Sequence, residues 1–300
     1  MKYIKIGLIC VLMSACLFTG CNSTTNKQDT IPTATITANP TVEPVAEEVT
    51  ISEQVITPTD DITITISDLD FIDSWYGPTI KMLIENNSEQ TICVQARDTS
   101  VNGWMVDSML SMDIAAGKKG YTGLVLSQSS LDLLDIDTLG TIEFYLHIFD
   151  YDTWEDIIDS DIITVNTSAA MSAVAPEVSG LELYADNDII VRAFGLVNDE
   201  VFGDDLYLTV TNNTDKTIQI YPDSVSVNDC MIDTIMYQEI APGKSAVCDI
   251  SFSKDSLTSS AITDINKIEF SLKVTTNYLD TIADIGPFII FVDNNTLKTS

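Results

Sequence analysis

The chain has 300 residues, with 14 basic against 45 acidic side chains and a formal net charge of −31. So acidic a surface repels phosphate backbones and anionic lipid headgroups, and the only adjacent basic pair is Lys118-Lys119, so we expect no nucleic-acid partner. Apolar residues make up 45% of the chain, enough to fill real cores, which excludes a chain that is disordered throughout.

The first 20 residues have the layout of a signal peptide. Lys2 and Lys5 give a positive start, an apolar run extends from Ile6 to Phe18, and small residues follow. The run is shorter than the roughly 20 residues of a membrane span, so we expect residues 1–20 to be cleaved off. An uncleaved anchor helix is the alternative.

The end of this leader suggests a lipid anchor. Leu17-Phe18-Thr19-Gly20-Cys21 resembles the lipobox of bacterial lipoproteins, although Phe18 stands where that pattern most often has leucine. The resemblance implies that Cys21 is diacylated and becomes the new N-terminus, on the extracytoplasmic face of the cell membrane. Two acyl chains give stable anchoring, so the membrane is an expected partner. Cleavage before Cys16 is a poorer match, because it leaves Leu17 and Phe18 exposed.

Residues 21–50 follow as a predicted disordered tether. From residue 22 to 50 the chain has eight threonines with Pro32, Pro40 and Pro44 and almost no large apolar side chains. Such a stretch buries too little surface to offset the entropy of ordering. A flexible chain of this length has its ends roughly 30 Å apart, and a polyproline-like one reaches about 90 Å.

Beyond the tether, the chain repeats itself at an offset of 126 residues. Residues 85–146 align without gaps on residues 211–272, with 21 identities in 62 positions. The matched runs are Asn86-Asn87 on Asn212-Asn213, Ser100-Val101-Asn102 on Ser226-Val227-Asn228, Gly117-Lys118 on Gly243-Lys244, and Ile142-Glu143-Phe144 on Ile268-Glu269-Phe270. A period this long indicates tandem domains, which we expect at 51–167 and 178–296, joined by a linker at 168–177.

Each copy shows the period of two that is typical of strands. Apolar and polar residues alternate from Ile142 to Phe149, from Ile268 to Val274 and from Ile62 to Ile66. Asn102-Gly103 is a hairpin signal, and only Ser130–Ile136 reads as a short helix. About seven strands in some 115 residues predict an all-β fold of two immunoglobulin-like β-sandwiches, with a small closed barrel as the alternative.

The shared turn and core residues, Asn-Asn, Ser-Val-Asn, Gly-Lys and Ile-Glu-Phe, look like those of the immunoglobulin-like domains of unknown function that are common in lipoproteins of Gram-positive bacteria. The resemblance covers both predicted domains. It implies fold and location, and that family has no agreed activity or site residues to transfer.

Catalytic patterns are sparse. His147, the only histidine, lies on the polar side of its predicted strand, and the second copy has Lys273 there. No G-x-S-x-G, P-loop or G-x-G-x-x-G motif is present. A carboxylate pair for glycoside hydrolysis is not excluded by counting, but no pair stands out among so many acids. We therefore predict that the chain is not an enzyme.

Metal and disulfide signals are equally weak. Past the predicted lipid cysteine remain Cys93, Cys230 and Cys248, without the spacing of a metal site, and a bond between the last two is left open. No cofactor is expected. The one metal alternative is calcium bound by Asp150, Asp152 and Asp156, which lie in the densest acidic stretch. That stretch departs from the EF-hand pattern, and a solvated acidic loop is the simpler interpretation.

Aromatic side chains give the best candidate for a ligand site. Trp75, Tyr76 and Trp154 lie in loop-like stretches of the first copy, where exposed rings are a hint of a protein or glycan ligand. Trp104 follows the predicted hairpin turn and packs across it in the simpler interpretation. The second copy has no tryptophan.

These features predict a membrane-anchored, extracytoplasmic lipoprotein that acts as a non-catalytic binding or adhesion module. Its partner would be an unidentified protein or glycan of the envelope or the exterior. A structural spacer or assembly partner in an envelope complex is the alternative, and an enzyme acting on a wall polymer is the third.

Overall fold

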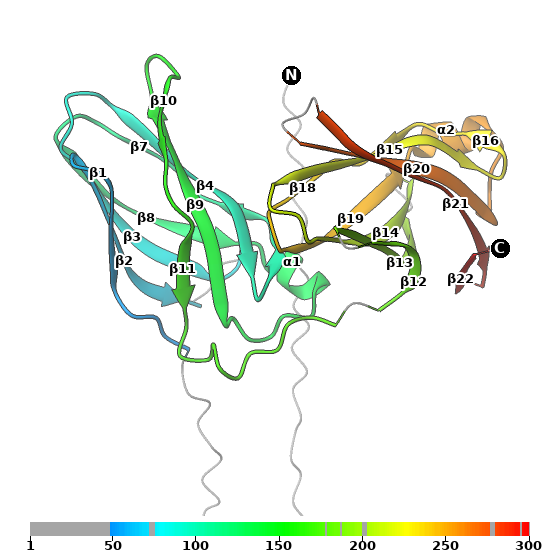
Figure 1. The fold of residues 1–300 in the computed structure, drawn as a ribbon, viewed down its shortest axis with the longest axis horizontal. Coiled ribbons are helices and arrows are strands. Elements are labelled where there is room, and N and C mark those ends of the chain that lie inside the picture. The colour runs from blue at the N-terminus through cyan, green and yellow to red at the C-terminus, as the bar shows by residue number, and fades with distance from the viewer. Residues whose placement is uncertain are drawn as a thin grey trace, which may run out of the picture. The chain divides into compact units, whose positions relative to one another are not determined.

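The structure, a computed structural model, describes residues 49–71, 76–177, 179–186, 188–199, 203–276, 280–294 and 296–299. The predicted signal peptide, Cys21, nearly all of the predicted tether and Trp75 lie outside the described residues. Strands dominate, which confirms the all-β class (Figure 1). Within the described ranges, no helix has the length and apolar character that a membrane crossing requires.

The first half of the described chain, residues 49–177, contains two groups of paired strands. One sheet has the strand order β1 (Gln54–Thr59), β2 (Ile62–Asp70), β3 (Thr79–Asn86), β8 (Lys118–Leu126) and β6 (Ser108–Met109). The other group has the order β10 (Asp156–Asp159), β9 (Thr141–Asp150), β4 (Ile92–Val101) and β5 (Trp104–Met105), with β7 (Ser111–Ile114) on β4 and β11 (Ile163–Asn166) on β9. The helix α1 (Gln128–Leu133) follows β8.

The second half, residues 179–299, repeats this plan. One group has the order β12 (Leu181–Ala185), β13 (Ile189–Asp199), β14 (Gly203–Asn212) and β19 (Ser245–Phe252), with β17 (Thr234–Ile235) on β19. The other has the order β16 (Cys230–Met231), β15 (Ile218–Val227), β20 (Lys267–Thr276), β21 (Asp280–Asp293) and β22 (Thr296–Thr299), with β18 (Gln238–Ile240) on β15. The helix α2 (Lys254–Ser259) follows β19.

Each half has its own hydrophobic core between its two groups of strands. In the first half, Ile64 and Ile84 from one sheet and Phe144 from the other are almost completely buried in one cluster. In the second half, Val191 and Phe270 occupy the same roles in a separate cluster. Burying alternate residues of every long strand is what places the two layers face to face. The predicted alternation is therefore confirmed.

Secondary structure confirms the 126-residue repeat element by element. Strands β4 and β15 begin at residues 92 and 218, β9 and β20 at 141 and 267, and α1 and α2 at 128 and 254, each pair differing by 126. The helix predicted at Ser130–Ile136 begins two residues earlier, because Ser127 caps its N-terminus by accepting a bond from the amide of Ser130. It ends three residues earlier, at Leu133.

The Asn-Asn motif is explained by a buried amide in each half. The side-chain nitrogen of Asn86 donates to the carbonyls of Gln90 and Ile114, both at 2.9 Å, while its oxygen accepts from the amide of Ser88. Asn212 makes the corresponding bonds to Lys216, Ile240 and Thr214. Both asparagines are 0% exposed, so these bonds compensate the cost of burying a polar group.

The Ser-Val-Asn motif closes a hairpin, as the Asn-Gly pair predicted. Asn102 and Gly103 have φ of 51° and 85°, which suits a tight turn between β4 and β5. The side-chain oxygen of Asn102 accepts from the amides of Gly140 and Thr141, at 2.9 and 3.1 Å. Asn228 does the same for residues 266 and 267 in the second half. The motif is thus a turn and a clamp on the next strand, with a structural role.

The two halves touch through different surfaces. Ser245 at the start of β19 forms a parallel bridge with Trp104 of β5, and its amide donates to the carbonyl of Gly103 at 3.1 Å. Beside this bridge, the ammonium of Lys244 pairs with the carboxylate of Glu143. Both side chains of the ion pair are largely buried, at 16% and 25% exposed.

Candidate functional site

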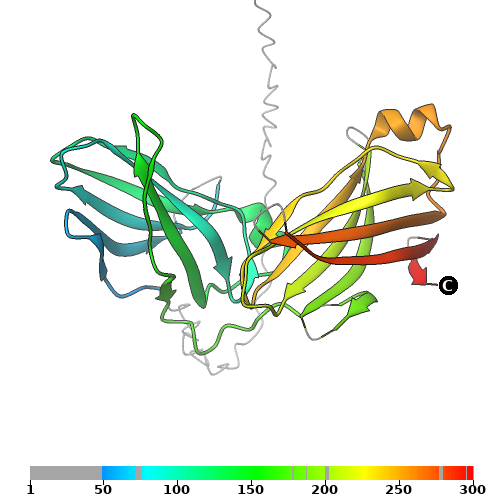
Figure 2. The same ribbon diagram turned by 45° about the horizontal axis from the view of Figure 1, so that its top comes forward.

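The hairpin of β9 and β10 distinguishes the first half from the second and holds the candidate site. Figure 2 shows it extending beyond the neighbouring strands. Asp156 pairs with Phe149 across the hairpin, and the amide of Asp150 donates to the carbonyl of Glu155 at 2.9 Å. The tip is therefore a loop of five residues, 151–155, held at its base by the strand ladder.

The side chain of Asp150 holds this turn together. One carboxylate oxygen accepts from the amides of Asp152 and Thr153, at 2.9 and 2.8 Å. The amide of Thr153, followed by its hydroxyl and the amide of Asp152, lowers the pKa of Asp150, because these donors favour the charged carboxylate. Asp150, the residue just before the loop, thus holds the turn in place through its side chain.

A stack of rings runs along the hairpin. Trp154 lies on Phe149 with ring centroids 5.5 Å apart and planes 19° from parallel, and Phe149 lies 5.4 Å from the ring of His147. Phe149 is only 6% exposed, whereas Trp154 is 73% exposed. The sequence placed Phe149 on the polar face of β9, but it is buried because Trp154 lies over it.

The backbone at the tip is unusual for so large a residue. Trp154 has φ of 63°, in the left-handed region that costs an ordinary residue about 1 kcal/mol or more. This conformation turns the indole back onto Phe149, and the stack compensates part of the cost. The result is an indole fixed in place and largely open to solvent.

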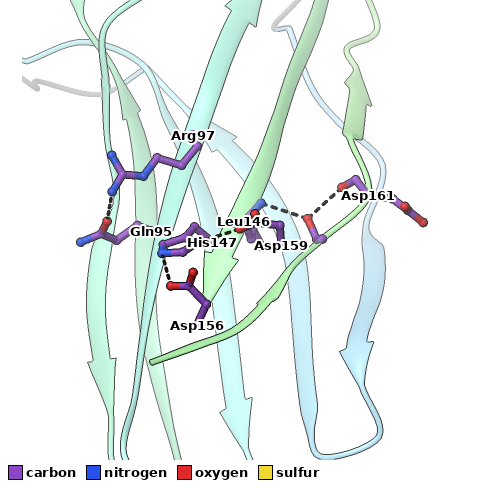
Figure 3. A network of polar contacts seen from close by, with 8 residues as sticks. Gln95, Arg97, Leu146, His147, Asp156, Asp159 and Asp161 are labelled. Atoms are coloured by element: carbon purple, nitrogen blue, oxygen red, sulfur yellow. Dashed lines mark hydrogen bonds and ion pairs between the residues drawn. The ribbon is translucent and has the colours of Figure 1, made fainter. Parts of the chain in front are cut away.

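His147 lies between two carboxylates at the base of the hairpin (Figure 3). Its Nδ1 lies 2.7 Å from Asp159, and its Nε2 lies 3.5 Å from Asp156. On the neighbouring strand β4, the guanidinium of Arg97 donates to Gln95 at 2.6 Å. Partly exposed polar contacts of this kind contribute at most about 1 kcal/mol each, so the cluster holds β10 against β9 and adds little to the total stability.

The structure separates the aromatic residues that the sequence grouped together. Trp154 lies at the end of the first half where β9 meets the start of β4, since Asp150 pairs with Ile92. Tyr76 is also exposed but lies at the opposite end, where its carbonyl accepts from the first residue of α1. Trp75 is outside the described residues. Trp104 is 4% exposed in the core, which confirms its packing role.

The three calcium candidates do not converge either. Asp150 faces the turn amides, Asp156 faces His147, and Asp152 is exposed in the loop. In the described part of the chain, no group of three or more His, Cys, Asp or Glu side chains is arranged to hold a metal. Cys93, Cys230 and Cys248 are free thiols.

The sequence analysis missed Phe149 and Asp159 as parts of this site. One signal was available: Ile148 and Phe149 are consecutive apolar residues at the end of an alternating strand, which indicates that both faces are covered there. In the second half, Lys273 and Thr275 stand in place of His147 and Phe149. Lys273 pairs with Asp223 at 3.4 Å, so the described residues of the second half have an ion pair where the first half has the ring of His147.

Comparisons with known proteins give no family. No family model and no curated protein matches the chain. Among solved structures, it is similar to the YadV chaperone at 11% identity, over 69% of this chain and 90% of that one, with a TM-score of 0.22. A protein of unknown function from Porphyromonas gingivalis W83 is similar at 11% identity, over 75% and 97%, with a TM-score of 0.20. Likeness at these scores carries no argument about function.

Proposed function

We propose that the chain is a lipid-anchored, extracytoplasmic binding module that works without catalysis. In this proposal the leader 1–20 is removed, Cys21 carries the lipid, and the tether presents two immunoglobulin-like sandwiches, at 51–167 and 178–296. The ligand, a protein or a glycan of the envelope or the exterior, binds at the tip of the β9–β10 hairpin.

The observation that carries this proposal is the indole of Trp154. It is 73% exposed, is held in one orientation by stacking on Phe149, and has no counterpart in the duplicated half. Its backbone is also strained, with a positive φ, and strain of this kind clusters at ligand-binding sites. Rigid aromatic rings also bind at low entropic cost, which is why they dominate binding hot spots.

The neighbouring groups suit a polar ligand. Tyr151 is 45% exposed in the same five-residue loop, and Asp152 and Glu155 of that loop are exposed as well. A sugar ring stacks on an indole through its C–H face while its hydroxyls donate to carboxylates, so a glycan matches both features of the tip. A peptide with basic side chains matches them through cation–π contact and charge.

The test uses the full chain and a panel of soluble polysaccharides cast into native gels, together with pull-downs from envelope extract, each with calcium and with chelator. We expect retention by one class of ligand that Trp154→Ala weakens at least about tenfold, the loss typical of a hot-spot residue. Tyr76→Ala is the matched control, because Tyr76 is equally exposed but lies at the other end of the first half.

Equal retention of both variants would contradict the assignment of the hairpin. Retention that requires calcium would support a calcium site in the acidic loop. A chain that binds nothing on the panel but co-purifies with one envelope protein through another surface would favour the spacer alternative, and turnover of a wall polymer would favour an enzyme.

A further inference from the structure

The contact between the two halves joins two different surfaces, and this asymmetry has a consequence in a duplicated chain. From the first half, Met105 of β5 packs against the core of the second half. From the second half, Val247 of β19 packs against the core of the first. The contact is therefore heterologous, with a donor face around β5 and β9 and an acceptor face around the start of β19.

Because the halves are equivalent, each also possesses the face that the other one uses. The first half has an unused acceptor face at the start of β8, and the second half has an unused donor face around β16 and β20. At the 126-residue offset, the unused counterparts are Met231 for Met105, Tyr121 for Val247, Lys118 for Lys244 and Glu269 for Glu143.

The unused faces retain the character of the used ones. Met231 and Tyr121 are 69% and 84% exposed, so apolar residues stand in solvent at the two positions whose counterparts pack into the contact. The ion pair of Glu143 and Lys244 is retained in residue type as Glu269 and Lys118. Single exposed apolar residues are ordinary, but two at matching positions of a repeated interface are a pattern.

Both faces also have open strand edges. On the side of β8 away from β3, the pairing with β6 involves only Val125 and Leu126, and the amide of Lys118 donates to the carbonyl of Ala115, so in the described part of the sheet residues 119–124 have no strand partner on that side. Strand β16 is the terminal strand of its group. Edges of this kind accept a further strand, as β19 does when it pairs with β5.

Charge supports the same pairing. In a chain of net charge −31, the only adjacent basic pair, Lys118-Lys119, lies on the acceptor face, and because Lys119 pairs with Glu85 at 2.6 Å, Lys118 supplies the charge that a partner meets. On the donor face, Asp229 and Glu269 carry carboxylates, which share the ammonium of Lys267 at 2.8 and 3.0 Å. Two carboxylates against one ammonium leave that face acidic, so the two faces attract each other.

We propose that a second copy of this chain docks through these faces, with the β16–β20 face of one molecule on the β8 face of the next. The contact repeats between chains the one that joins the halves within a chain, with Lys118 against Glu269 and β16 beside β8. Such a heterologous contact leaves one donor and one acceptor face free on every assembly, so growth is open-ended. The proposal does not depend on the ligand of the hairpin, but its test in membranes rests on the proposed lipid anchor at Cys21.

The contact is weak in solution and gains strength on a surface. Within the chain, the linker holds the halves at an effective concentration in the millimolar range or above. Two separate molecules lack that advantage, and anchoring many copies on one membrane restores part of it. We therefore expect rows of molecules in membranes and monomers in dilute solution.

The experiment is zero-length carbodiimide cross-linking in membranes of cells that express two differently tagged full chains. This reagent joins an amine to a carboxylate that already touches it. We expect a ladder of products in which the second tag co-isolates with the first, and a cross-linked peptide that joins Lys118 to Glu269. Lys118→Glu alone and Glu269→Lys alone each reduce the ladder at least about tenfold, because like charges then meet.

Co-expression of the two variants distinguishes this contact from a loss of folding. In the mixture, the two reversed side chains meet each other with opposite charges at one contact, and the native pair of Lys118 and Glu269 forms at the other, so the ladder returns. Lys216→Glu, a charge reversal at an exposed residue off both faces, is the control and leaves the ladder unchanged. The proposal is overturned if either single reversal leaves the ladder unchanged. It is also overturned if the mixture of the two variants gives no cross-linked products, or if the native chain gives none.

Discussion

The two halves of this molecule share their scaffold, and the ring stack of the β9–β10 hairpin is a feature of the first half. Asn86 and Asn212 make the same buried bonds, and the Asn102 clamp recurs at Asn228. The β9–β10 hairpin alone carries the ring stack under Trp154. Both halves keep the buried bonds that folding needs, whereas the aromatic residues of the hairpin are replaced in the second half, which is the behaviour expected of a scaffold that carries a single binding site.

The shared scaffold is tested most severely at its buried asparagines. Asn86→Ala removes the donors that satisfy two carbonyls and leaves those groups buried without partners. We expect the free energy of unfolding to fall by about 3 kcal/mol, and Asn212→Ala to cost a similar amount. Urea titration followed by circular dichroism measures both.

Asn87→Ala is the control for this pair, since Asn87 is exposed and the loss of its side chain changes stability by no more than about 0.5 kcal/mol. A large loss at only one of the two buried asparagines would show that the halves do not share the role of this residue, and the equivalence would fail.

A smaller effect concerns Asp98, where the halves differ in charge. Burial, and then the nearby carboxylate of Glu239, raise the pKa of Asp98, while the hydroxyl of Thr217 lowers it. A raised folded-state pKa gives stability that is complete below the unfolded value of about 3.9 and is lost as pH rises through the folded value. Asp98→Asn is therefore more stable than the native chain near neutral pH, and the gain shrinks as pH falls toward 4.

The counterpart of Asp98 is Ser224, which shares its left-handed backbone, with φ of 55° against 49°. Ser224→Asn is the matched control and gives no pH-dependent gain, because no carboxylate is removed. Thermal unfolding across the acidic range measures both variants, and a pH-independent response of Asp98→Asn would contradict the assignment.

The smallest effect is expected at Asp150, and its pH dependence has the opposite sign. The turn amides lower its pKa, so its contribution to stability is present above the unfolded value of about 3.9 and is lost as pH falls through the lower folded value. Asp150→Ala lowers the melting temperature near neutral pH but not in strong acid. Asp152→Ala, in the same loop, leaves the melting temperature unchanged, and equal losses would show that Asp150 is not what orders the turn.

How far the sequence predicts this molecule depends on the range of the interactions involved. The alternation of β9 as far as Ile148 and the Asn102-Gly103 turn are local patterns, and each predicted its structure correctly. Tyr76 and Trp154 are 78 residues apart in the chain, and only the strand pairing shows that they lie at opposite ends of one half. The burial of Phe149 depends on the left-handed φ of Trp154, which no composition or period indicates.

The most direct test of the central claim is a tryptophan-fluorescence titration of the full chain with the polysaccharide that the gel panel retains. The account predicts that saturating ligand changes the emission of the exposed Trp154, and that Trp154→Phe removes this change and weakens binding while leaving the emission of the buried Trp104 as it was. An emission change of the same size in Trp154→Phe, with affinity unaltered, would show that the ligand binds elsewhere and that the hairpin is not the site.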